Sequence, residues 1–230
     1  MKVAQRSGMA RLGAAALHIG DALADNGRAA FAIFSLGALL AYLIAAEVIR
    51  PGSTPYWGYL TGQMGAVLIA LVLGEILFAR QGGLSWVTHV VAAGSCYADT
   101  LGTAAHYYLY IQEYDKVTHF AGSAAFSSGA YDCLRGLHAQ RRISAQQTTR
   151  LWLCIALGVG VGFGWEVYEF IGDKVFHTAR VYGFWDTFND IVSDALGAVT
   201  GLLLAVFEQR AAERELGTAI AVRDQREDAT

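Results

Sequence analysis

The sequence predicts an all-α, polytopic membrane protein, built as a six-transmembrane-helix bundle with an N-terminal interfacial helix. Three observations support this fold class. First, the chain of 230 residues is 54% hydrophobic and 16% charged, whereas a soluble domain has about 25% charged residues. Second, its apolar residues fall into six runs, each close to the length of about 20 residues that crosses a bilayer as a helix. Third, its basic residues lie mostly on one side of those runs.

The six apolar runs are the predicted spans, and they cover residues 29–49, 57–78, 84–105, 117–134, 149–172 and 188–207. The third run is the least apolar, because it contains His89 and Asp99 among small residues. That side of the helix is stable only against other protein. The chain is therefore expected to have three parts: an interfacial segment over 1–28, a transmembrane domain over 29–207 and a cytoplasmic tail over 208–230.

The distribution of Lys and Arg predicts the topology. With a cytoplasmic N-terminus, 13 of the 17 basic residues lie inside and 4 outside. This bias favours six crossings with both termini cytoplasmic. The first 28 residues lack the apolar core of a cleavable signal peptide. The four external residues are Arg50, Lys116, Lys174 and Arg180.

Composition also excludes several classes of protein. A formal net charge of -3 and scattered arginines argue against a nucleic-acid partner. Cys96, Cys133 and Cys154 all fall within predicted spans without a Cys-x-x-Cys pair, so we expect buried free thiols and no disulfide framework. The lipid bilayer is the one partner that composition predicts.

Glycines at helical spacing mark the last two spans. Gly158 and Gly162 repeat every four residues in the fifth span, and Gly197 and Gly201 do so in the sixth. Gly-x-x-x-Gly faces let two helices approach closely. We therefore expect the fifth and sixth spans to pack against each other through these faces.

Ionisable side chains within a membrane are costly and usually functional, and here they form three groups. Each group lies on one helical face, because its members are three or four residues apart. With the predicted topology, all three groups lie at the external end of the bundle. The groups are Asp115 with His119, Glu166 with Glu169, and Asp186 with Asp190 and Asp194.

The convergence of these groups predicts a divalent-cation site at the external end. Close carboxylates in a low-dielectric setting need a compensating charge, and an oxygen-rich set with one imidazole favours Mg, Mn, Fe or Zn. The predicted ligands are Asp115, His119, Glu166, Glu169, Asp186 and Asp190. The residues expected to support them or to contact a substrate are Lys116, Asp194, His106 and Arg180.

Simpler roles are available for single members of this set. Asp115 can pair with Lys116, Asp186 can cap the sixth helix, and Glu166 can point to water from an aromatic belt. A network of shared protons balanced by Lys116, Lys174 or Arg180 is the rival to a metal. Several other residues look isolated or solvated in the sequence: Glu47, Glu75, His89, Asp99, His106 and His177.

Four short motifs resemble a known family. They are Tyr114-Asp115-Lys116-x-x-His119-Phe120, Trp165-Glu166-x-x-Glu169, Trp185-Asp186-Thr187-x-x-Asp190 and Leu196-Gly197-Ala198. In order and spacing they resemble the YjdF-like bacterial inner-membrane proteins over residues 84–201, and more distantly the VanZ-like proteins. The chain departs from both groups: it has Val181 to Phe184 where YjdF-like proteins have Gln-Gly-Asp, and Asp194 where VanZ-like proteins have Asn. The resemblance implies a shared membrane fold and no established reaction.

Three functions remain open at this point. The first is a metal-dependent enzyme that acts on a lipid or a lipid-linked phosphate at the external leaflet. The second is a transporter or binding protein for an ion or small solute, although such sites usually lie near the midplane between repeated halves. The third is an accessory subunit whose glycine faces dock a membrane protein partner.

Overall fold

A computed structural model of the chain describes residues 27–52, 56–111, 113–177 and 181–227. This part of the chain consists of helices and loops without a strand, which confirms the all-helical class. The predicted interfacial helix over 1–28 lies outside the described residues, apart from Gly27 and Arg28, which begin α2. Six long helices match the six apolar runs: α2 (Gly27–Ile49), α3 (Trp57–Phe78), α4 (Trp86–Ala104), α6 (Tyr114–Ala139), α7 (Gln147–Phe176) and α8 (Phe184–Glu227). Two short ones, η1 (Ala79–Gln81) and α5 (Tyr107–Tyr110), lie in the connections.

Four of the long helices have the length and hydropathy of membrane spans. They are α2, α3, α7 and the first part of α8, over Ala29–Ile49, Trp57–Gln81, Gln147–Val175 and Phe184–Arg214. Large apolar side chains such as Phe31, Phe34 and Trp152 are exposed on them, as expected of surfaces that face lipid. α4 and α6 are more polar because their buried faces carry groups such as His89 and Asp132.

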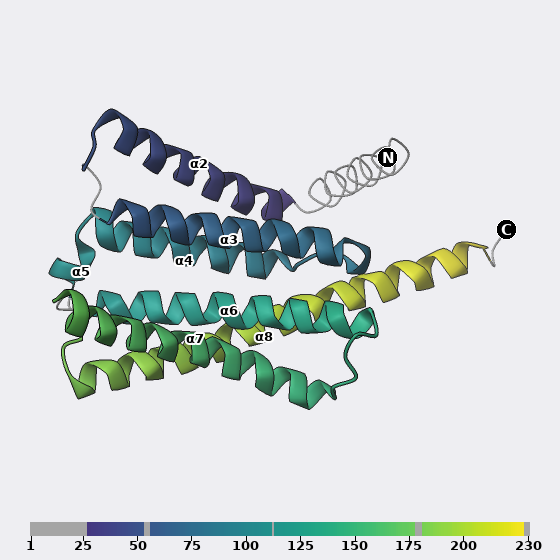
Figure 1. Ribbon diagram of the computed structural model, residues 1–230. Helices are drawn as coiled ribbons and strands as arrows, with labels where there is room; N and C mark the ends of the chain where they lie inside the picture. Colours follow the sequence, from purple (N-terminus) through teal and green to yellow (C-terminus); the bar gives the residue numbers. More distant parts are fainter. Residues whose placement is uncertain (1–26, 53–55, 112, 178–180, 228–230) are drawn as a thin grey trace, which may run out of the picture.

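The helices form two groups of three, which Figure 1 shows one above the other: α2, α3 and α4, then α6, α7 and α8. The groups meet where α4 packs on α6, and α6 also contacts α7 and α8. α6 is therefore surrounded by protein on several sides. This position explains how it tolerates a polar sequence within a membrane protein.

The connections define two ends of the bundle. α5, the start of α6, the end of α7 and the start of α8 lie together at one end, whereas η1 and the turn from α3 to α4 lie at the other (Figure 1). α8 has 44 residues, a length of about 66 Å at 1.5 Å per residue. It is therefore much longer than a hydrocarbon core of about 30 Å, and its C-terminal part extends beyond the other helices (Figure 1).

The glycine faces pack differently from the sequence expectation. Gly197 and Gly201 lie against the backbone carbonyls of Phe120 and Ala124 on α6. On α7, Gly158 packs against Ala198 of α8 and against α6, and Gly162 lies against Asp194 of α8. The α7 face thus packs on both α8 and α6, whereas the α8 face packs on α6, which carries small residues such as Ser127 at this depth.

Other local expectations have mixed outcomes. Cys96, Cys133 and Cys154 are free, with Cys96 and Cys154 buried, which confirms the prediction of free thiols.

Asp186 does not cap α8, because the helix begins two residues earlier, at Phe184. The first turn closes on Gly183, whose carbonyl accepts from the Asp186 amide and whose φ of 119° suits glycine.

Candidate functional site

The three acidic groups predicted from the sequence come together at the end of the bundle where α6 and α8 begin and α7 ends. His119, Glu166, Glu169, Asp190 and Asp194 are buried there. The Asp115 and Lys116 side chains are 29% and 17% exposed. The cluster is thus buried on its inner side and reaches the surface through Asp115, Lys116 and Asp186.

His119 lies at the centre of the cluster. Its Nδ1 is 3.2 Å from Oδ1 of Asp194, which also accepts a hydrogen bond of 2.7 Å from the Ser123 hydroxyl. A carboxylate only accepts, so His119 carries a proton on Nδ1 and, in the neutral ring, has a lone pair on Nε2. A carboxylate that orients a histidine in this way is the usual support for a metal-binding imidazole.

The other ring nitrogen of His119 faces carboxylates. Nε2 lies 3.3 Å from Oε1 of Glu166 and 3.9 Å from Oδ1 of Asp115. Both Nε2 and Glu166 Oε1 are buried and make no hydrogen bond. Two lone-pair atoms at this distance repel each other unless a proton or a cation lies between them.

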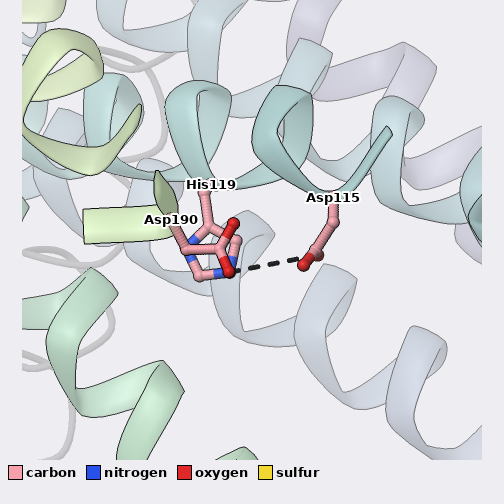
Figure 2. Close-up of side chains that lie close together, drawn as sticks. All are labelled: Asp115, His119 and Asp190. Carbon is pink, nitrogen blue, oxygen red and sulfur yellow. Dashed lines mark ion pairs between the residues drawn. The ribbon is translucent and has the colours of Figure 1, made fainter. Parts of the chain in front are cut away.

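Two sets of side chains place ligand atoms close enough to share an ion. In each set the atoms lie within 4.8 Å of one another: Asp115, His119 and Asp190 in the first, His119, Glu166 and Glu169 in the second. Figure 2 shows the side chains of the first set turned toward one another. Ligands at 2.0 to 2.6 Å from one ion have this separation.

Lys116 pairs with α8 and not with its neighbour Asp115. Its Nζ lies 2.5 Å from Oδ1 of Asp186 and 3.1 Å from Oδ1 of Asp190. The suggested Asp115–Lys116 pair is therefore wrong, since successive residues on a helix point in different directions. Asp186, a predicted ligand, belongs to neither set of metal-competent atoms among the described residues.

Gly162 makes room for the Asp194 carboxylate. A Cβ at this position would overlap the carboxylate itself, so a side chain here requires Asp194 to move. The Gly-x-x-x-Gly spacing in α7 therefore serves the polar site as well as helix packing.

Asp99 is not isolated. It is buried in α4 and accepts hydrogen bonds from the Tyr59 and Tyr108 hydroxyls at 2.8 and 2.6 Å. Burial next to this carboxylate raises the pKa of Tyr108, so the phenol remains a donor. Neither partner is close to Asp99 along a helical face, and the sequence contained no signal for this contact.

The remaining candidates lie away from the cluster or beyond the described residues. His106 and His177 are exposed, as expected for solvated loop residues. The Lys174 ammonium lies over the Phe170 ring, 5.4 Å from its centroid. Glu47 accepts from the Gly52 amide. Arg180 lies outside the part of the chain that the structure describes.

A second polar cluster, missed in the sequence, lies at the opposite end of the bundle around the start of α4. His89 Nε2 is 3.2 Å from Oε1 of Glu75, and His89 Nδ1 is 2.9 Å from the Ser85 carbonyl. Glu75 also accepts from the Leu84 amide. His89 and Glu75 are thus partners, although they come from different helices and looked isolated in the sequence.

Two more carboxylates complete this second cluster. Asp132 of α6 accepts from the amide and hydroxyl of Ser85 and from the hydroxyl of Thr88. Glu208 of α8 accepts from the amides of Trp86 and Val87, at 3.0 and 3.1 Å. Carboxylates from three helices thus bind the otherwise unsatisfied amides at the start of α4.

Comparison with known proteins gives a family. Residues 31–211 match the family model described as predicted membrane proteins, DUF2238. The chain belongs to this family. The match covers all six long helices in whole or in part and is consistent with the YjdF-like resemblance, and it does not show the VanZ-like one. No curated protein and no solved structure matches the chain.

Proposed function

We propose that this DUF2238 protein binds a divalent cation at the end of the bundle where α6 meets α7 and α8, and that the cation acts on the phosphate of a lipid. The observation that carries the proposal is the pair of buried atoms without a hydrogen bond, His119 Nε2 and Glu166 Oε1. They lie 3.3 Å apart and belong to a set of three potential ligands.

A cation satisfies this arrangement better than a proton does. A proton between Nε2 and Oε1 leaves the nearby carboxylates of Asp115 and Asp190 to repel each other. A divalent ion attracts all of them at once. The Asp194–His119 hydrogen bond supports this reading, because it directs the Nε2 lone pair at the other ligands.

Elemental analysis of the protein purified in detergent and loaded with Mn²⁺ tests the proposal. We expect at least one ion per chain, and loss of the ion in Glu166→Gln. Glu75→Gln is the matched control, because Glu75 is also buried and lies 3.2 Å from a histidine Nε2, yet belongs to neither metal-competent set. A wild-type protein without metal, whose melting temperature a chelator leaves unchanged, would instead favour a network of shared protons.

The proposal includes six crossings with this site at the external face. α4 and α6 pack within the bundle, where polar faces are tolerated, and six spans leave 13 of the 17 basic residues on the cytoplasmic side. Reporter fusions after Arg142 and after Lys174 measure the topology. We expect a cytoplasmic and an external signal, respectively, and the reverse result contradicts the external site.

A lipid phosphate fits the surroundings of the site. Lys116 and Asp115 are partly exposed, and the exposed aromatic rings of Tyr182, Phe184 and Trp185 adjoin the start of α8. Aromatic rings of this kind sit at the headgroup level of a bilayer. A cation there can polarise a phosphoryl oxygen or activate water, and the Lys116 ammonium can attract the anionic headgroup.

Paramagnetic broadening tests the substrate class. We expect Mn²⁺-loaded protein to broaden the ³¹P resonance of a short-chain phosphatidic acid, and Glu166→Gln to abolish the effect. Broadening by inorganic phosphate alone indicates a free phosphate as the ligand. If the ion is retained but neither resonance broadens, the phosphate proposal fails and the transporter interpretation is favoured.

A further inference from the structure

The Lys116 ammonium is paired with one of the potential ligands of the cation. Asp190 belongs to the set with Asp115 and His119 whose ligand atoms lie within 4.8 Å of one another, and Figure 2 shows the three side chains turned toward one another. The Lys116 Nζ lies 3.1 Å from Oδ1 of Asp190. An ammonium and a divalent ion attract a carboxylate through the same negative charge. Asp190 is therefore only partly available to a cation while Lys116 is paired with it.

The ammonium lies on the outer side of this ligand. The side chains of Lys116 and Asp186 are 17% and 19% exposed, whereas that of Asp190 is 1% exposed. Nζ lies 2.5 Å from Oδ1 of Asp186 as well as 3.1 Å from Asp190, so it joins a carboxylate at the surface to a buried one. An anion that approaches from the surface therefore meets the Lys116 ammonium before it reaches Asp190.

Lys116 can leave Asp190 and keep its other partner. Asp186 and Asp190 are four residues apart on one face of α8, and a lysine ammonium turns easily between acceptors because its stem is flexible. Asp186 is held at the start of α8, since its Oδ2 accepts from the Tyr182 amide at 3.2 Å. The ammonium thus retains a fixed carboxylate at the surface when a phosphate there replaces Asp190.

We propose that the anionic phosphate of a lipid headgroup draws Lys116 away from Asp190, and that the freed carboxylate then joins the ligands of the cation beside His119. This inference rests on the proposed function and deepens it, because it makes the lipid complete the cation site. It involves a single ion, since His119 belongs to both sets of potential ligands. Linkage makes the effect mutual: the cation strengthens lipid binding by the same factor by which the lipid strengthens cation binding.

This coupling gives the site selectivity for phosphate. A lipid without a phosphate offers Lys116 no replacement for Asp190, so the cation has one carboxylate fewer. A lipid with a phosphate supplies that replacement and places its own oxygens next to the ion. The cation is therefore bound most tightly when its substrate is present.

Titration of Mn²⁺ into the detergent-purified protein, with and without short-chain phosphatidic acid, tests the inference. We expect the lipid to raise the Mn²⁺ affinity of the wild type about 10-fold. Without lipid, Lys116→Met should bind Mn²⁺ about 10-fold more tightly than the wild type, and lipid should then add less than about 3-fold, because Asp190 is already free. Adding Asp190→Asn to Lys116→Met should remove the gain.

Lys174→Met is the matched control for charge. Lys174 lies in the last turn of α7 at the same end of the bundle, and its ammonium lies over the Phe170 ring, 5.4 Å from the centroid. The variant loses the same positive charge and should keep the wild-type Mn²⁺ affinity. If it gains as much affinity as Lys116→Met does, long-range electrostatics explains both gains and the inference is overturned.

The outcomes separate this inference from the proposed function. If phosphatidic acid leaves Mn²⁺ affinity unchanged in the wild type, or raises it equally in Lys116→Met, the role of Lys116 is overturned and the proposed cation site stands. A gain in Lys116→Met that survives Asp190→Asn overturns the assignment of Asp190. If inorganic phosphate raises the affinity as much as phosphatidic acid does, the assignment to a lipid is overturned. A wild type that binds no Mn²⁺ overturns both the inference and the proposed function.

Discussion

Both ends of this bundle bury a histidine against a glutamate, and the difference between them shows what separates a structural cluster from a candidate site. His89 faces Glu75 at 3.2 Å, and His119 faces Glu166 at 3.3 Å. At the His89 end the neighbouring carboxylates accept from backbone amides and hydroxyls at the start of α4. At the His119 end Glu166 Oε1 makes no hydrogen bond.

The two clusters differ in the number of free backbone amides near their carboxylates. The start of a helix offers amides without partners, and α4 presents four in succession to carboxylates: those of Leu84, Ser85, Trp86 and Val87. The buried members of the His119 cluster lie after the first turns of α6 and α8 and along α7, where the amides bond within the helix. Glu166 keeps one buried oxygen without a donor there, and in the proposed function a cation takes the place of that donor. The comparison favours a structural role for the His89 end and is consistent with the ligand binding that we propose for the His119 end.

The largest expected effect on stability is at the His89 end. Asp132→Ala leaves the amide and hydroxyl of Ser85 and the hydroxyl of Thr88 without their acceptor. We expect the free energy of unfolding in detergent to fall by about 3 kcal/mol, with metal content unchanged. A fall in the free energy of unfolding of less than about 1 kcal/mol, or a loss of metal, would contradict a purely structural role for the His89 end.

Separate substitutions of His119 and His89 test the roles of the two ends through metal affinity. His119→Gln removes the one imidazole of the site, and we expect Mn²⁺ affinity to fall at least about 100-fold, more than for a supporting residue. His89→Gln should leave the affinity unchanged and lower the melting temperature. Isothermal titration of both variants measures this, and equal affinities would contradict the assignment of the His119 end.

The Asp194→Asn variant tests whether metal binding needs the orientation of His119 as well as its presence. An amide can donate to Nδ1 and move the imidazole proton to Nε2, which blocks the lone pair. We expect Mn²⁺ affinity to fall about 10- to 100-fold with little change in yield. Ser123→Ala removes only one donor to Asp194 and should have the smaller effect; the opposite ranking would argue against a positioning role for Asp194.

The smallest effect comes from two glycines on one helix. A Cβ at Gly162 overlaps the Asp194 carboxylate, whereas nothing lies within 4 Å of a Cβ at Gly160. Gly162→Ala should lower stability by about 1 to 2 kcal/mol and weaken Mn²⁺ binding. Gly160→Ala should be neutral or stabilising by up to about 1 kcal/mol, because alanine favours a helix. Equal melting curves for the two variants would show that Asp194 shifts without cost.

Most of the confirmed sequence predictions came from helical periodicity. Apolar runs located all six long helices, with the bounds of α3 matching the predicted span. Spacings of three and four residues placed Asp115 with His119 and Glu166 with Glu169 on shared faces, and the structure brings these faces together. Both results depend on contacts within one helix, which sequence spacing determines.

The failures involve contacts between helices. Gly197 and Gly201 pack on α6, and Lys116 pairs with Asp186 in place of its neighbour Asp115. The carboxylates of Asp132 and Glu208 were missed because their partners lie about 45 and 120 residues away in the chain. No local pattern encodes a contact of that range.

By itself, the sequence determined the helical class, the positions of the long helices and which ionisable residues share a helical face, since all three follow from local composition and the pitch of the helix. Only the tertiary structure decided which nitrogen of His119 is held by Asp194, and which carboxylates find donors. These depend on how the helices are rotated and placed against one another, through the packing of small residues such as Gly162.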